Sequence, residues 1–200
     1  MMIRTSVDVR SAKPDETSHA VDTIVAAFLT DPIARFAFPS PHEYLRAAAP
    51  AFREFAGGSV EHGTAYVSAD FCGAAFWFPP GTHPDGEALE RTFRDMACPE
   101  HLDDLLATFE KMGQSHPDEP HWYLPIVGVE PNAQRRGLGT ELMRHALARC
   151  DREGLPAYLE SSNPRNISLY LRHGFEVTGE IRIGAGPLVT PMVRPPVKSR

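Results

Sequence analysis

One segment in the second half of the chain combines glycines and arginines in an order suited to binding an anion. An apolar stretch ends at Val129, and a short polar segment containing Arg135 and Arg136 follows. Gly137 and Gly139 then open a helical pattern. The start of a helix presents backbone N–H groups without partners, and glycine lets a phosphate approach them closely. The segment therefore predicts a site for a phosphorylated cofactor.

Two familiar phosphate-binding loops account for this segment poorly. A P-loop needs a Gly-Lys-Ser/Thr sequence, which the chain lacks. A dinucleotide-binding Rossmann loop has the right strand–glycine–helix order, and Glu160 ends the next strand at about the expected distance of ~20 residues. However, Leu142 stands where the third glycine is needed, and the loop from Val129 to Gly137 is too long for the tight first turn.

A different family explains the segment better. Residues 134–139 read Gln-Arg-Arg-Gly-Leu-Gly, with a hydrophobic strand before them and a helix after them. Residues 163–175 contain an asparagine, a tyrosine and a final Gly-Phe pair on a short helical pattern. Residues 134–139 resemble the Q/R-x-x-G-x-G/A signature of the GCN5-related N-acetyltransferases (GNAT superfamily), and residues 163–175 are similar to a later segment of the same family. The resemblance is clear over residues 121–183 and weak before residue 60.

Three shorter stretches resemble a puromycin-acetyltransferase-like branch of that superfamily. They are Trp-Phe-Pro-Pro-Gly at residues 77–81, His-Trp-Tyr-Leu at residues 121–124, and residues 158–163. The superfamily resemblance implies an α/β fold: a mixed, mostly antiparallel sheet of six or seven strands with helices on both faces and a splayed central strand pair. Pro125 suits a bulge there, since proline donates no hydrogen bond within a central strand.

The elements that must position these segments follow from hydrophobic periodicity and turn residues. Helices are expected over residues 14–29, 43–56, 86–113, 138–152 and 164–172. The third of these should be broken near residues 98–99. Strands are expected over residues 3–9, 63–69, 72–78, 121–129, 156–160, 175–183 and 188–193. Asp31-Pro32 should end the first helix, and Pro50 should split or kink the second. We expect one domain over residues 1–200, in which residues 1–120 shape the acceptor site, residues 121–194 bind acetyl-CoA and carry catalysis, and residues 195–200 form a disordered tail.

The resemblance also implies where acetyl-CoA binds as a co-substrate. The backbone N–H groups of Arg135 to Thr140 would hold its pyrophosphate, and its pantetheine arm would lie along Val127–Val129. A backbone N–H group near Val127 would polarise the thioester carbonyl. The residues assigned to the cofactor are Val127, Gly128, Val129, Gln134, Arg135, Arg136, Gly137, Leu138, Gly139, Thr140 and Asn166.

Tyr170 is the first candidate for a catalytic side chain. When an amine attacks the thioester, the thiolate of CoA must leave, and a phenol near the sulfur can donate a proton or a hydrogen bond to it. From spacing alone, an aromatic ring packed at a helix end is an equally good interpretation. The resemblance favours the role of Tyr170 as a general acid.

A proton must also be removed, because an amine at neutral pH is mostly protonated. Glu160, at a strand end beside the expected cleft, is the first candidate base, although it is equally suited to capping the next helix or pairing with an arginine. His121 is the second candidate, although a histidine at this position is more often a surface residue. A chain of water molecules is the remaining alternative.

These residues predict direct acetyl transfer from acetyl-CoA to a primary amine of a small molecule, in a ternary complex. No cysteine or serine lies in a nucleophile motif, so an acyl-enzyme is not expected. The alternative from another class is a non-catalytic acyl-CoA-binding or regulatory module.

Composition excludes several other classes of protein. The net charge of −6 argues against general nucleic-acid binding. No apolar run reaches the ~20 residues of a membrane span, and the first residues lack the apolar core of a secretory signal, so a cytoplasmic protein without membrane partners is expected. The 3 cysteines and 9 histidines lack metal-ligand spacing, and no metal is expected. The last strand, if it is an edge, would allow a homodimer.

Overall fold

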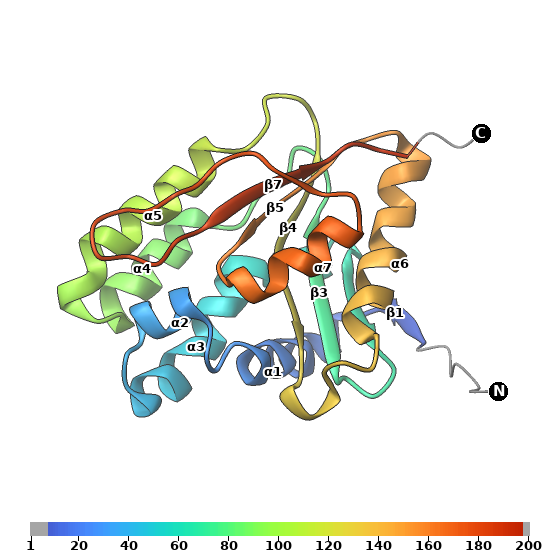
Figure 1. Ribbon diagram of the computed structural model, residues 1–200. Coiled ribbons are helices and arrows are strands. Elements are labelled where there is room, and N and C mark those ends of the chain that lie inside the picture. The colour runs from blue at the N-terminus through green and yellow to red at the C-terminus, as the bar shows by residue number, and fades with distance from the viewer. Residues whose placement is uncertain (1–7, 198–200) are drawn as a thin grey trace.

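The computed structural model describes residues 8–197, which form a central sheet covered by helices (Figure 1). The strands are β1 (Val9–Ser11), β2 (Ala65–Ser68), β3 (Gly73–Phe78), β4 (Trp122–Val129), β5 (Ala157–Ser161), β6 (Glu176–Val177) and β7 (Thr190–Arg194). They form one 7-stranded sheet in the order β1-β2-β3-β4-β5-β7-β6. β4 and β5 run parallel, and the other neighbouring pairs are antiparallel. The predicted α/β fold with a mixed, mostly antiparallel sheet is confirmed.

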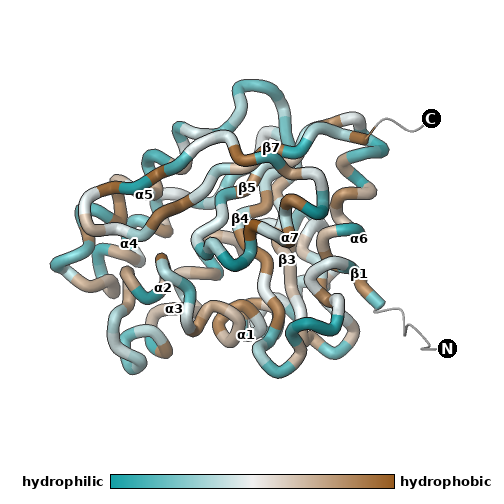
Figure 2. The backbone as a smooth tube through the Cα atoms, in the orientation of Figure 1, coloured by the Kyte–Doolittle hydropathy of each residue, from teal (hydrophilic) through white to brown (hydrophobic). Residues whose placement is uncertain are grey.

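Helices cover both faces of this sheet. They are α1 (Thr17–Ala27), α2 (Pro32–Ala37), α3 (Pro41–Ala56), α4 (Gly86–Met96), α5 (Leu102–Gln114), α6 (Leu138–Glu153) and α7 (Ile167–Arg172). Helices α6 and α7 share one hydrophobic cluster with Trp122, Leu124 and Leu159 of the sheet. On the opposite face α1 packs against Phe76 and Ile126, and α2 to α5 form a cluster of their own beside it. In Figure 2, α1 is largely hydrophobic, whereas the loop before β4 is hydrophilic.

The two prolines have different outcomes. The first helix ends at Ala27, before Asp31-Pro32, as predicted, and Pro32 begins a new helix, α2. The Asp31 carboxylate accepts hydrogen bonds from the N–H groups of Ile33 (3.0 Å) and Ala34 (3.1 Å). Proline is well suited to the first position of a helix, where its missing N–H has no partner to lose. Pro50 does not divide α3, which runs unbroken over 16 residues and buries one side against its neighbours.

The C-terminal part of the sheet also differs from the prediction. The strand expected over residues 175–183 is reduced to Glu176–Val177, followed by a single bridge between Ile181 and Val189. The chain between Ile181 and Val189 contacts α5 instead of the sheet, since the N–H of Ala185 donates to the Asp104 carboxylate of α5 (2.8 Å). β7 is not an edge strand, because β5 and β6 flank it. The homodimer predicted through an exposed last strand therefore has no such edge to use.

The predictions for the chain ends are tested only in part. β1 starts at Val9, and most of the strand expected over residues 3–9 lies outside the described residues, as do residues 198–200 of the expected tail. None of the helices within residues 8–197 has the length and apolar character that crossing a membrane requires.

Gly128 of β4 allows α1 to approach the sheet closely. A Cβ atom at this position would lie 2.7 Å from the Cβ of Ala27 and 3.0 Å from the Cδ1 of Ile24. Such contacts are too short for carbon atoms, so a larger residue would push helix and strand apart. The glycine is needed for packing between these elements.

Replacing Gly128 with alanine should therefore lower the free energy of unfolding by about 1–3 kcal/mol, as other overpacked cores do. Urea unfolding followed by tryptophan fluorescence measures this change. Gly113→Ala is the matched control, because a Cβ atom there meets nothing within 4 Å and alanine favours the helix by up to about 1 kcal/mol. Equal destabilisation by both substitutions would contradict the packing argument.

Candidate active site

The parallel strands β4 and β5 separate in the middle of the sheet. They pair only where Trp122–Leu124 meets Ala157–Leu159. Beyond this point β4 continues along β3 and β5 continues along β7. The register between β3 and β4 shifts between Phe76 and Phe78, which leaves an extra residue on β4 beside Pro125. The predicted splay and bulge are both present, and they leave a gap between the two strands.

Backbone groups of β4 face this gap. The N–H of Glu130 donates to the carbonyl of Cys72 across the strand pair (2.8 Å), whereas the carbonyl of Val129 accepts from the Gln134 side chain (3.1 Å). Because backbone groups alternate along an antiparallel strand, Val127 and Val129 direct their N–H and C=O groups away from β3. Gly128 directs its own groups toward β3.

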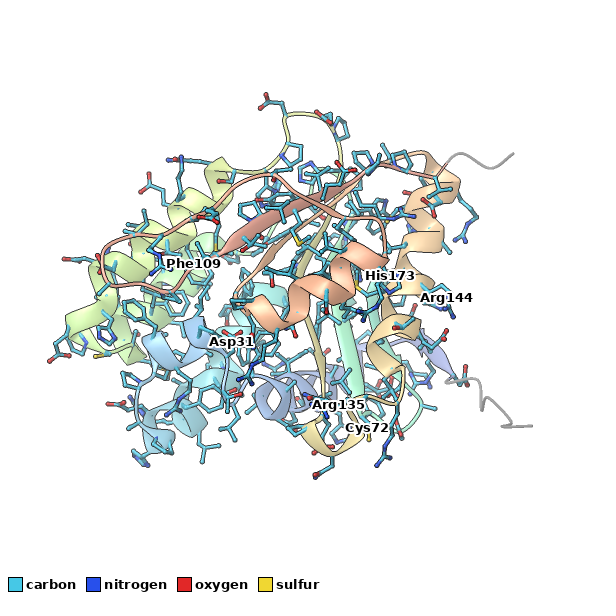
Figure 3. All side chains as sticks on the ribbon, viewed as in Figure 1. Asp31, Cys72, Phe109, Arg135, Arg144 and His173 are labelled. Carbon is cyan, nitrogen blue, oxygen red and sulfur yellow. The ribbon has the colours of Figure 1, made fainter. Side chains whose placement is uncertain are left out.

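The loop before α6 leaves a row of backbone N–H groups free. Arg135 and Gly137 have left-handed φ angles of 63° and 90°. The first hydrogen bond of α6 runs from the N–H of Glu141 to the carbonyl of Gly137 (3.0 Å), and within residues 8–197 the N–H groups of residues 135–140 meet no acceptor. Left-handed residues at a helix start create a concave anion site. Figure 3 shows Arg135 in this loop.

The loop, β4 and α7 meet at Gly139. A Cβ atom at this glycine would lie 3.6 Å from Leu169 of α7 and 3.8 Å from Val129 of β4. The tertiary structure thus gathers the two motifs, which are separated in sequence, beside the strand gap. Asn166 lies at the start of α7, is exposed and caps no helix with its side chain.

Tyr170 is the buried residue of α7. Its ring belongs to the cluster of α6 and α7 and packs edge-on against Phe175 at 6.1 Å, so the packing role left open by the sequence is real. Its hydroxyl meets no hydrogen-bond partner among the described residues. Burial, and secondarily the charge of Asp31, raises the pKa of Tyr170, so the phenol keeps its proton at neutral pH. A protonated phenol can donate to a thiolate.

Glu160 of β5 lies at the same gap but faces the opposite side of the sheet. Its side chain is 1% exposed, and its Oε1 atom lies 3.5 Å from the Nε2 of His116. Neither structural role left open by the sequence is observed within the described residues, since it caps no helix and pairs with no arginine. Burial raises the pKa of Glu160 to about 8, although the hydroxyls of Tyr158 and Tyr123 act against this shift. A pKa in this range suits proton transfer near neutral pH.

His121, the second candidate base, does not contact Glu160 directly. Its Nε2 lies 3.0 Å from the Nδ1 of His116, and its Nδ1 lies 2.7 Å from the carbonyl of Glu119. His116 stands between His121 and Glu160. The sequence pattern did not point to His116, because it lies in an irregular loop and approaches Glu160 only through the tertiary fold.

Glu160 lines an apolar cavity of about 60 Å³. Its polar lining residues are Asp31, Glu160 and Ser162. Its apolar walls come from α2 to α5 and the ends of neighbouring elements, and include Phe28, Phe38, Phe52, Phe55, Phe93 and Phe109. Figure 3 shows Asp31 and Phe109 on this side of the molecule. A wider cavity of about 1130 Å³ adjoins it, since Phe55, Phe93 and Phe109 line both.

Asp31 is a second buried carboxyl group that the sequence analysis did not assign to the site. It caps α2 and accepts a hydrogen bond from the Ser162 hydroxyl just beyond β5. Burial raises the pKa of Asp31, while these hydrogen bonds lower it. The contact holds α2 against the far edge of the strand gap. Elsewhere in residues 8–197, no group of three or more His, Cys, Asp or Glu is arranged to hold a metal ion.

Comparison with known proteins points to the same family as the sequence motifs. A model described as the acetyltransferase (GNAT) family matches residues 88–175, which include the anion loop, the strand gap and α7. The chain is 28% identical over 176 residues to an uncharacterized N-acetyltransferase of Schizosaccharomyces pombe, covering 78% of this chain and 69% of that protein. The match and the relative support a GNAT-type N-acetyltransferase. The enzyme is thus an acetyltransferase, and the match to this family implies acetyl-CoA rather than NAD.

Solved structures of GNAT proteins share the fold of this enzyme. One from Corynebacterium glutamicum, named histone acetyltransferase HPA2 and related acetyltransferase, is 26% identical with a TM-score of 0.68, and the match covers 98% of this chain and 99% of that one. An agmatine N-acetyltransferase is 16% identical with a TM-score of 0.67, covering 94% and 98%. The likeness to the agmatine enzyme concerns the fold alone.

Gly137→Ala should weaken acetyl-CoA binding at least tenfold. Its φ of +90° costs an alanine about 1–2 kcal/mol, and relaxing that strain turns the free N–H groups away from the anion site. Gly63→Ala is the matched control, because Gly63 also has a positive φ (+65°) and open space around it. Both substitutions should lower stability similarly, and calorimetric titration with acetyl-CoA should separate them. Unchanged affinity in Gly137→Ala would contradict the anion site.

The buried Glu160 should make stability fall as pH rises. The unfolded carboxyl loses its proton near its ordinary pKa, whereas the folded one keeps it until about pH 8, so unfolding releases a proton between these values. Relative to Glu160→Gln, the wild-type free energy of unfolding should decrease by up to about 1.4 kcal/mol per pH unit over that range. Denaturant unfolding from pH 5 to pH 8 measures the slope. The exposed Glu176→Gln should match wild type, and a flat difference for Glu160→Gln would refute the assigned burial effect.

Proposed function

We propose that this enzyme transfers the acetyl group of acetyl-CoA directly to the primary amine of a small molecule with an apolar body. The observation that carries the proposal is the buried Glu160 carboxyl group at the strand gap, where it lines an apolar cavity. Tyr170 approaches the same gap from the face covered by α6 and α7. The two sides of the sheet would therefore supply the two reactants.

The residues of the gap suit acetyl-CoA. The free N–H groups of residues 135–140 would bind its pyrophosphate, and Arg135 and Arg136 would add positive charge. Val127 and Val129 would pair with the pantetheine arm through the backbone groups that face the gap. Gln134 contributes by closing the loop onto Val129. Gly128 would lie beside the same arm, and its missing side chain also serves the packing of α1.

Bound acetyl-CoA supplies a thioester, and the side chains at the gap accept and donate the protons of the reaction. We assign Glu160 as the base that takes a proton from the amine, since no other carboxyl group of the cavity is free of structural hydrogen bonds. The N–H of Val127 would donate to the thioester carbonyl. Tyr170 would donate to the leaving sulfur.

Direct transfer is favoured because the cysteines are poorly suited to forming an acyl-enzyme. Burial raises the pKa of Cys150 to about 12 and also raises that of Cys72. The thiol of Cys98 donates to the Glu100 carboxylate, which raises the pKa of Cys98. A thiol needs to ionise to act as a nucleophile.

The cavity favours an acceptor with one cationic end. The amine would approach Glu160, but a further charge held inside this cavity would lie among phenylalanine side chains without partners. Burying an unpaired charge is strongly unfavourable. The agmatine N-acetyltransferase with the same fold acts on a small amine, which supports the size class rather than the identity of the acceptor.

Two finer assignments complete the proposal. We place the chain in the puromycin-acetyltransferase-like branch because of residues 77–81, 121–124 and 158–163. We also assign the acceptor site to the half of the chain before residue 121, because α2 to α5 line the cavity, and the acetyl-CoA site to residues 121–194.

The proposal is tested by measuring CoA thiol release with four acceptors: 2-phenylethylamine, agmatine, spermidine and a lysine-containing histone-tail peptide. We expect 2-phenylethylamine to have a kcat/KM at least tenfold above that of spermidine. In Tyr170→Phe, kcat should fall by about 10²-fold while the affinity for acetyl-CoA stays the same. A preference for spermidine or the peptide would overturn the apolar acceptor. Unchanged turnover would overturn the role of Tyr170, and acetyl-CoA binding without turnover on any amine would support the non-catalytic alternative.

A further inference from the structure

Three side chains form a line that leads from the strand gap toward the protein surface. Glu160 lies 3.5 Å from the Nε2 of His116, and the Nδ1 of His116 lies 3.0 Å from the Nε2 of His121. The Nδ1 of His121 lies 2.7 Å from the carbonyl oxygen of Glu119, which ends the line. Neither histidine belongs to residues 134–139 or 163–175, the two sequence motifs of the family resemblance.

The carbonyl at the outer end fixes the direction of every hydrogen bond in the line. A carbonyl can only accept, so His121 must carry its proton on Nδ1 and present a lone pair at Nε2. His116 must then donate from Nδ1, which leaves its own Nε2 as an acceptor directed at Glu160. Each ring therefore has an acceptor nitrogen on the side of Glu160 and a donor nitrogen on the side of the solvent.

The surroundings of Glu160 make such a line useful. The carboxyl side chain is 1% exposed, whereas that of His116 is 16% exposed. His116 and His121 both line the cavity of about 1130 Å³, while Glu160 does not. A proton held by Glu160 therefore has a path to this cavity through the two rings.

The ring of His116 is held in place for this role. It packs against Tyr123 and Tyr158 with ring centroids 4.5 Å away in each case. The titratable groups that face it are Glu160 and Tyr158 from β5, Tyr123 from β4, His83 from the loop after β3 and His121. Burial, with the added effect of His121 and His83, lowers the pKa of His116 to about 4, so its ring is neutral at pH 7. A neutral ring can accept at one nitrogen while it donates at the other.

We propose that His116 and His121 conduct the proton that Glu160 removes from the acceptor amine to the water of the wider cavity. The proton passes from Glu160 to the Nε2 of His116, and the Nδ1 proton of His116 passes to the Nε2 of His121. The Nδ1 proton of His121 leaves its hydrogen bond to the Glu119 carbonyl and passes to water of the wider cavity. The net change is one proton moved from the amine to solvent, and each ring is then reset by a half-turn about its Cβ–Cγ bond, which returns it to the same plane. This inference rests on the role of Glu160 in the proposed function.

The kinetic test compares His116→Phe with wild type, using the best acceptor of the four amines named above. Phenylalanine keeps the packing on the two tyrosines but carries no proton. We expect kcat at pH 7 to fall about tenfold with KM for acetyl-CoA unchanged, and added imidazole to restore it toward the wild-type value. His121→Phe should show a smaller loss with the same rescue. His62→Phe is the control, because within the described residues His62 packs on Phe78 but forms no hydrogen bond with a side chain of the line.

Three kinetic outcomes would overturn the relay. They are an unchanged kcat in His116→Phe, a loss that imidazole does not restore, and a loss of the same size in His62→Phe. If wild type has no turnover with any of the four amines, the proposed function fails, and the relay fails with it.

A separate test needs no acceptor. Ring ¹⁵N NMR of the wild-type protein at pH 7 should show both His116 and His121 as neutral Nδ1–H tautomers, and Glu160→Gln should preserve that state in His121. A proton on the Nε2 of either histidine would overturn the relay whether or not the enzyme turns over. Because this readout is independent of activity, it separates a failure of the relay from a failure of the proposed function.

Discussion

The separation of β4 from β5 after Leu124 is the constraint on which the rest of the site depends. Parallel strands normally satisfy each other's backbone groups along their length, so a gap between them leaves N–H and C=O groups in need of partners. The outer strands do not satisfy these groups but keep both strands in the sheet, since β3 continues to pair with β4 and β7 continues to pair with β5. Pro125 marks the change, because it has no N–H to leave unsatisfied.

The gap also divides the molecule into two chemical environments. On one side, α6 and α7 flank the gap with the free N–H groups of residues 135–140 and the buried Tyr170. On the other side, α2 to α5 line an apolar cavity that Glu160 also lines. The contact between Asp31 and Ser162 joins these halves, since it fixes the start of α2 to the chain that follows β5.

Burial gives Glu160 its chemical character. An exposed carboxyl group would be ionised and well solvated at neutral pH, and it would bind a proton too weakly to exchange one with an amine efficiently. Withdrawing it from water raises its pKa but also cuts it off from solvent. The rings of His116 and His121 restore a connection to solvent, because they link Glu160 to the wider cavity.

The sequence alone determined the features that depend on local order. The glycine-rich loop, the helix after it, Tyr170 on its short helix and the proline within the central strand were all predictable, because each follows from neighbouring residues and their backbone preferences. The sequence also indicated the sheet, since its hydrophobic periods are local. Only the tertiary structure decided which distant residues meet: Asp31 with Ser162, Glu160 with His116, and Gly128 with α1. These pairs are far apart in the chain, and burial, which sets the pKa of Glu160, exists only once helices from the first half cover the gap.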